Sequence, residues 1–117
     1  MTAAPTDVRL IDLCAAADVP PDTMKLCEVE DELVLVTNLN GQFHAAQGIC
    51  SHEYFELDRG QLTGESILCT LHMSRFSLID GEVTDPPAEL PLAVYPVVVA
   101  GGRVQIEVPA GPLQVNR

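Results

Sequence analysis

Hydrophobic and polar residues alternate over short stretches along most of the chain, which is the pattern of half-buried β-strands. Three such stretches follow one another, at residues 23–30, 32–37 and 42–46. Asn40-Gly41 separates the second from the third, and this pair favours a tight hairpin turn because both of its central positions need a positive φ. The pattern therefore predicts an antiparallel meander that ends just before Cys50.

Further strands are predicted on both sides of this meander. Residues 8–13 read as a strand, and residues 75–79 with the turn Asp80-Gly81 read as the start of a hairpin. Residues 92–100 and 103–108 read as a last hairpin around Gly101-Gly102. Pro96 lies inside the first of these two runs, and because proline cannot donate to a strand ladder it favours an edge position.

Helical periodicity is hard to find anywhere, so the predicted fold class is all-β, with sheets packed as a small sandwich or barrel. The length of 117 residues, nearly half of them hydrophobic, suits one domain with its own core.

The net charge changes which partners are expected. With 17 acidic and 6 basic residues the formal charge is -11, which argues against nucleic acid because binding a phosphate backbone requires clustered Lys and Arg. A basic patch on a partner protein would be attracted instead. The first residues carry no basic start followed by an apolar run, and no apolar stretch reaches membrane-spanning length, so we expect a cytoplasmic protein without a membrane partner.

Two of the four cysteines and two of the three histidines form a spaced motif. The spacing is C-x-H, then sixteen residues, then C-x-x-H, and it comprises Cys50, His52, Cys69 and His72. Turn residues between the pairs can fold the chain back and bring the two loops together. Two thiolates and two imidazoles suit either one tetrahedral zinc ion or an iron–sulfur cluster.

The order of the ligands favours the cluster. A zinc finger of the C2H2 kind groups its cysteines in one place and its histidines in another, whereas each loop here supplies one of each. Mixed loops suit a two-iron cluster in which one iron takes both cysteines and the other takes both histidines.

The two boxes, Cys50-Ser-His52 and Cys69-Thr-Leu-His72, resemble the Rieske [2Fe-2S] motif. Further stretches are similar to the stand-alone ferredoxins of bacterial aromatic-ring-hydroxylating dioxygenases: Gly41-Gln-Phe43, Gln47-Gly-Ile-Cys50, Leu71-His-Met-Ser-Arg-Phe76, Gly81, Asp85-Pro-Pro-Ala88 and Tyr95-Pro96. The similarity covers roughly residues 23 to 108.

The resemblance implies a single Rieske-like domain over residues 1–117, with three antiparallel sheets and a cluster-binding tip. It implies ligand loops at about residues 48–56 and 69–76 and a proline loop at about residues 84–88. It also implies that Cys50 and Cys69 bind the inner iron of one [2Fe-2S] cluster and that His52 and His72 bind the outer iron.

The same resemblance implies a function in electron transfer rather than an enzyme. The carrier would take single electrons from an NAD(P)H-dependent flavoprotein reductase and pass them to a terminal Rieske non-haem iron oxygenase in aromatic-compound oxidation. High-potential Rieske proteins have a Ser and a Tyr after the second box; Ser74 matches the first and Phe76 replaces the second. We expect Ser74 to raise the reduction potential modestly, because a hydrogen bond to sulfur stabilises the reduced cluster.

Two alternative functions remain at this stage. One is a Rieske-type small subunit of another redox enzyme, such as a nitrite reductase, and the other is a structural zinc module. His44 lies outside both boxes and is expected to be an ordinary histidine, since four ligands already complete the site. Cys14 and Cys27 are expected to be buried thiols, with no structural disulfide.

Overall fold

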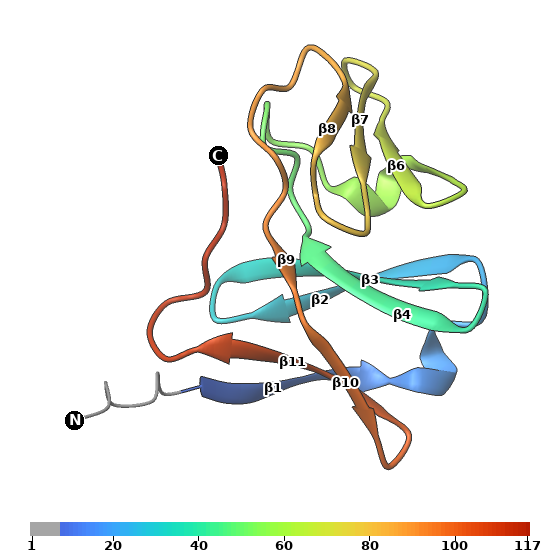
Figure 1. Cartoon of the computed structure of the whole chain (residues 1–117), viewed down its shortest axis with the longest axis vertical. Helices are drawn as coiled ribbons and strands as arrows, with labels where there is room; N and C mark the ends of the chain where they lie inside the picture. Colours follow the sequence, from blue (N-terminus) through green and yellow to red (C-terminus); the bar gives the residue numbers. More distant parts are fainter. Residues whose placement is uncertain (1–7) are drawn as a thin grey trace.

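The computed structural model of the chain describes residues 8–117, and the strands within this range form three antiparallel sheets (Figure 1). Two short 3-10 helices, η1 (Ala16–Asp18) and η2 (Leu57–Arg59), are the helical elements of this range. No helix among residues 8–117 has the length and apolar character needed to cross a membrane. The prediction of an all-β fold with three antiparallel sheets is confirmed, so the layers are neither one simple sandwich nor one barrel.

The first sheet has the order β1-β11-β10 and comprises β1 (Val8–Ala15), β10 (Val97–Ala100) and β11 (Arg103–Pro109). The second has the order β2-β3-β4-β9 and comprises β2 (Thr23–Val29), β3 (Glu32–Leu39), β4 (Gln42–Gln47) and β9 (Val94–Tyr95). The third has the order β5-β6-β7-β8 and comprises β5 (Gln61–Thr63), β6 (Ser66–Cys69), β7 (Ser74–Ser77) and β8 (Val83–Asp85). We call the first two sheets the base and the third sheet with its loops the tip.

The meander predicted from the alternating pattern is the centre of the base. β3 pairs with β2 on one side and with β4 on the other, both in antiparallel register. Asn40 and Gly41 have φ angles of 54° and 94°, as the turn between β3 and β4 requires. The side chain of Asn38 accepts a hydrogen bond of 2.7 Å from the Gly41 N–H, which helps to close this turn. β4 then delivers the chain to the tip.

The run at residues 92–100 is divided between two sheets instead of forming one strand. β9 pairs with β4 in the middle sheet, and β10 pairs with β11 in the first sheet. Pro96 stands between them, where its missing N–H donor costs no ladder bond. Both strands lie at the edges of their sheets, but Pro96 belongs to neither, so the run predicted as one strand is two short edge strands joined at the proline.

A glycine fixes the junction where the chain leaves the tip for the base. Gly81 has a φ of 81°, and a Cβ atom at this position would lie 2.0 Å from the carbonyl oxygen of Leu92. The Leu92 N–H donates to the carbonyl of Gly81 at 2.8 Å. Only glycine allows this close contact between the β7–β8 turn and the segment that leads into β9.

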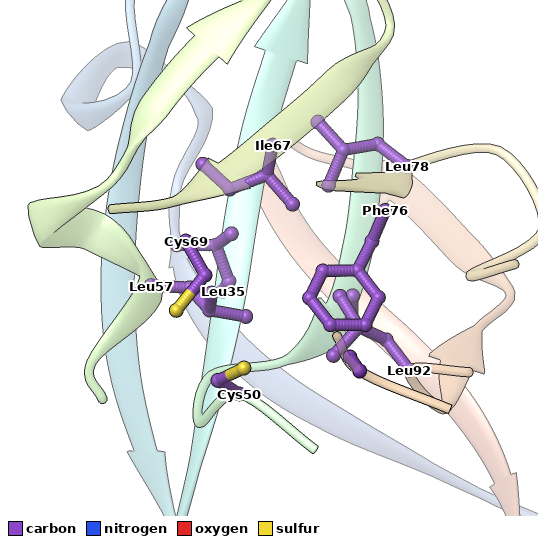
Figure 2. Close-up of a cluster of buried hydrophobic side chains, with 10 residues drawn as sticks. Leu35, Cys50, Leu57, Ile67, Cys69, Phe76, Leu78 and Leu92 are labelled. Atoms are coloured by element: carbon purple, nitrogen blue, oxygen red, sulfur yellow. The ribbon is translucent and has the colours of Figure 1, made fainter. Parts of the chain in front are cut away.

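A buried cluster joins the tip to the base, and it includes two of the predicted ligands (Figure 2). Phe76 of β7 and Leu35 of β3 are both completely buried in it. Cys50 and Cys69 belong to the same cluster. The thiols therefore lie at the edge of a well-packed apolar core, which holds the loops that carry them.

Candidate metal centre

The two cysteines of the motif come together where the tip meets its apolar core. Cys50 follows the end of β4, and Cys69 is the last residue of β6; their exposed fractions are 3% and 1%. The thiol of Cys50 lies close enough to raise the pKa of Cys69, and Figure 2 shows the two sulfur atoms facing the same space. Both are free thiols, as are Cys14 and Cys27, in agreement with the expectation of no disulfide.

The two histidines of the motif lie outside this core. His52 and His72 are both exposed, and their ring centroids are 5.3 Å apart with the planes at 86°. Since each histidine follows its cysteine by two or three residues, the buried sulfur pair and the exposed imidazole pair belong to one site. The structure thus places the two cysteines beside one another and the two histidines beside one another, on the same two loops.

Backbone hydrogen bonds close the first ligand loop below its tip. The Cys50 N–H donates to the carbonyl of Phe55 at 3.0 Å, and the Leu57 N–H donates to the carbonyl of Gly48 at 2.8 Å. Ile49 and Glu56 form an isolated antiparallel bridge between these two bonds. The loop is therefore a short, pinned excursion, and His52 lies in the part that projects beyond the pin.

Burial raises the pKa of the Cys69 thiol to about 11. Backbone N–H groups of Leu71 and His72 donate to its sulfur and oppose this rise. These N–H groups come from the loop that ends in Met73, whose φ is 65°. Donors aimed at a buried sulfur suit a ligand that carries negative charge when metal is bound.

The proline loop and the second ligand loop are joined through Ser74. This side chain is completely buried, and its Oγ accepts a hydrogen bond of 3.0 Å from the Ala88 N–H. Ser74 also stands opposite Cys69 in the β6–β7 register. Because the oxygen is the acceptor in that bond, the hydroxyl proton stays available to donate.

A carboxylate from the first loop contacts a histidine of the second. Glu53 Oε1 lies 3.2 Å from His72 Nε2, and both side chains are about half exposed. The ligand atoms of His52, Glu53 and His72 all lie within 4.8 Å of one another. Sequence reasoning gave no sign of this contact, because it depends on how the two loops cross.

The remaining histidine lies elsewhere. His44 stands on β4 opposite Thr37 and lines a groove with residues such as Leu78 and Pro96. No residue of either motif box lines that groove, which fits the expectation that His44 is not a ligand.

Sequence reasoning included Gln47 in a family-like stretch but gave no role to this buried polar side chain. It is the last residue of β4, is 2% exposed, and donates to the carbonyl of Ile49 at 2.8 Å. The sequence did contain a sign of it, because a polar residue follows the two alanines of a predicted strand and stands three positions before Cys50. Nothing in the pattern indicated which groups it would bond.

The donor set fits a two-iron cluster better than a zinc ion. Two buried sulfurs lie on the inner side and two exposed imidazoles on the outer side, so one iron can bind both sulfurs and the other iron both imidazoles. A structural zinc site has no need for such a division.

Comparisons with known proteins agree with this interpretation. Residues 9–96 match the Rieske [2Fe-2S] domain family. The chain is 33% identical over 104 residues to the ferredoxin component of biphenyl 2,3-dioxygenase from Rhodococcus jostii, with 89% of this chain and 97% of that protein covered. It is 37% identical over 101 residues to the ferredoxin component of the alkene monooxygenase system from Xanthobacter autotrophicus, with coverages of 86% and 82%.

Solved structures show the same likeness. The Sphingomonas yanoikuyae B1 ferredoxin is 26% identical with a TM-score of 0.81, and the match covers 86% of this chain and 100% of that one. A ferredoxin in the complex of reduced oxygenase and oxidised ferredoxin of carbazole 1,9a-dioxygenase is 29% identical with a TM-score of 0.78, with coverages of 90% and 97%.

Proposed function

The chain belongs to the family of Rieske [2Fe-2S] domain proteins, and from this premise we propose that it is the ferredoxin component of a multicomponent oxygenase. In this role it carries one electron at a time from an NAD(P)H-dependent flavoprotein reductase to a terminal oxygenase. The observation that carries the proposal is the pairing of two buried thiols with two exposed imidazoles at one end of the molecule.

Four residues would hold the cluster: Cys50 and Cys69 on the inner iron, and His52 and His72 on the outer one. The cluster, when bound, supplies a centre that takes up and gives back a single electron at a higher potential than an all-cysteine cluster does. The thiols are held by the apolar core, while the imidazoles stand at the surface. This division leaves the histidine edges as the exposed side of the site.

The surface around the histidines suits a transient docking partner. Tyr54, Leu71, Met73 and Leu90 are exposed apolar side chains of the tip. An apolar patch at the point of transfer, within a protein of charge -11, fits reversible binding to a partner with a basic rim. The carbazole dioxygenase complex is a relative in which a ferredoxin and an oxygenase are bound together.

The proposed role has no catalytic residues in this chain. The substrate would bind to the terminal oxygenase, and relatives belong to systems for aromatic compounds and for alkenes. We infer that all 117 residues form one Rieske domain, with ligand loops at about 48–56 and 69–76 and a proline loop at about 84–88. Exchange with an NAD(P)H-dependent reductase would place the protein in the cytoplasm.

The test begins with the purified protein, oxidised and then reduced with dithionite. We expect a brown protein with two irons and two sulfides per chain, and a reduced EPR signal of lower average g than that of an all-cysteine cluster. Zinc without sulfide would contradict the proposal.

The role as a shuttle is tested separately from the cofactor. With a ferredoxin reductase and NADH, turnover of a terminal oxygenase should depend on this protein and should fall as the salt concentration rises. Copurification with one partner at all salt concentrations would instead indicate a permanent subunit of another redox enzyme.

A further inference from the structure

Residues 113–117, which we call the strap, run back from the base to the tip (Figure 1). They lie beyond the part of the chain that matches the Rieske family. Leu113 is buried in the core of the base, and the carbonyl of Gln114 accepts a bond of 2.6 Å from the Tyr95 hydroxyl. The strap has no regular secondary structure, so its order depends on these contacts and on those of Asn116.

Asn116 is bonded to the foot of the first ligand loop. Its N–H donates to Gln47 Oε1 at 2.9 Å, and its carbonyl accepts from Gln47 Nε2 at 2.6 Å. Its side-chain amide donates to the carbonyl of Pro91 at 3.0 Å. One residue of the strap thus contacts both β4 and the segment that follows the proline loop.

Gln47 uses all of its hydrogen-bonding capacity. The Nε2 group donates to Ile49 and Asn116, and Oε1 accepts from the N–H groups of Ala93 and Asn116. The orientation of the amide is unambiguous, because exchanging its oxygen and nitrogen would face two donors with two donors. Glutamate has no donor for the two carbonyls, and leucine has neither donor nor acceptor, so at 2% exposure either would leave buried groups unpaired.

The consequence reaches the peptide bond that precedes the first ligand. The Ile49 carbonyl accepts from Gln47 at 2.8 Å, and the Cys50 N–H on the other side of the same peptide donates to Phe55 at 3.0 Å. A peptide plane held at both ends cannot rotate freely, so the backbone that leads into Cys50 is held in one orientation. Ser51 adds a bond of 2.6 Å to the carbonyl of Leu90.

The geometry points to Gln47 and the strap as a positioning device for the first ligand loop. Asn116 holds the side chain of Gln47, and Gln47 in turn holds the Ile49–Cys50 peptide bond that precedes the first ligand. This inference rests on the proposed function, since it assigns the device to the cluster site. Without the strap, the Ile49 carbonyl and the segment that follows the proline loop would both be held less firmly. The first ligand loop would then open more often.

The main variant is the holoprotein that ends at Gln114, which keeps Leu113 and the bond to Tyr95. Its matched control is Arg117→Ala, which removes only an exposed ion pair with Glu32. The readout is the loss of the visible absorption in excess chelator. We expect the shortened chain to lose its cluster at least about tenfold faster, as the loss of the three hydrogen bonds of Asn116 implies, and the control to match the full chain.

Amide exchange separates positioning from general stability. Faster cluster loss with unchanged exchange in β2, β3 and β4 supports the device, whereas equal acceleration in those strands contradicts it. Equal rates of cluster loss in the shortened and full chains contradict it as well. If the shortened chain does not fold, Gln47→Glu, which removes the donors and keeps the size, should show the same faster loss.

A measurement on the unaltered protein completes the test. The Asn116 N–H should exchange slowly although it lies in irregular structure, where exchange is otherwise fast. Fast exchange of this amide in iron-loaded protein would overturn the inference about the strap and leave the proposed function unaffected. A protein that binds no iron would contradict the proposed function, and the exchange of Asn116 would still report whether the strap is docked.

Discussion

The molecule contains two pairs of buried cysteines, one in the base and one in the tip, and only one pair has the surroundings of a metal site. Cys14 of β1 and Cys27 of β2 lie close enough to shift one another's pKa, and Cys50 likewise shifts the pKa of Cys69. The base pair packs among side chains such as Val36 and Val104. The tip pair has backbone N–H donors aimed at its sulfur and two exposed imidazoles beside it.

The difference shows that two adjacent thiols are not enough for a site. In the base, burial raises the pKa of Cys27 to about 12 and the charge of Lys25 opposes this rise only in part, so the pair stays protonated and apolar. In the tip, loops replace the continuous strands, and N–H groups of loop backbone that are not used in strand pairing can donate to the sulfur. The same residue type is a core residue in one region and a candidate ligand in the other.

Removing one cysteine from each pair gives the largest contrast. Cys69→Ala should abolish cluster binding, because three ligands cannot complete a site built for four, and iron and sulfide should fall to background. Cys27→Ala should keep the full iron content and lower the free energy of unfolding by about 1–2 kcal/mol, as the loss of a small buried side chain does. Iron analysis and denaturant unfolding measure these effects in both variants. Loss of iron in Cys27→Ala would contradict the distinction between the two cysteine pairs.

The next largest effect concerns the pH dependence of the base. A thiol whose pKa is about 12 when folded and 9.0 ordinarily favours the unfolded chain once the pH exceeds 9.0. Its contribution is therefore complete below pH 9 and is lost as the pH rises toward 12, by up to about 4 kcal/mol.

The control for this dependence is the double variant Cys14→Ala/Cys27→Ala. All other titratable groups are the same in both proteins, so the difference between the two unfolding curves isolates the thiols. A constant difference from pH 8 to 11 would contradict burial of the pair as protonated thiols.

Particular residues show how far the sequence alone could predict this molecule. The Asn40-Gly41 turn and the C-x-H and C-x-x-H spacings are local features, so the meander and the four candidate ligands followed from them. Gln47 and Asn116 are 69 positions apart, and no periodicity predicts such a bond. The contact between Glu53 and His72 likewise depends on how two loops cross, which the spacing leaves open.

Within the tip, Ser74 tests whether a buried hydroxyl tunes the site. The structure leaves its proton free to donate, because its oxygen accepts from Ala88. Ser74→Ala should lower the midpoint potential by some tens of mV, since the reduced, more negative cluster loses a donor. Ser77→Ala, on the same strand, is the matched control; its Oγ accepts from the exposed Ile79 N–H instead. An unchanged midpoint in Ser74→Ala would remove the hypothesis.

Glu53 gives the smallest expected effect and separates the exposed side of the site from the buried one. Its carboxylate lies 3.2 Å from His72 Nε2, and negative charge beside a ligand opposes the arrival of an electron. Glu53→Gln should therefore raise the midpoint by roughly 10–40 mV, the equivalent of roughly 0.2–1 kcal/mol for an exposed pair. The shift should shrink in high salt, because exposed charges are screened, whereas the shift of Ser74→Ala should persist. Glu56→Gln, on the same loop but bonded to Tyr54 at 3.4 Å, should move the midpoint less. Equal shifts in the two glutamate variants would mean that the midpoint responds to the total charge of the tip and not to the contact with His72.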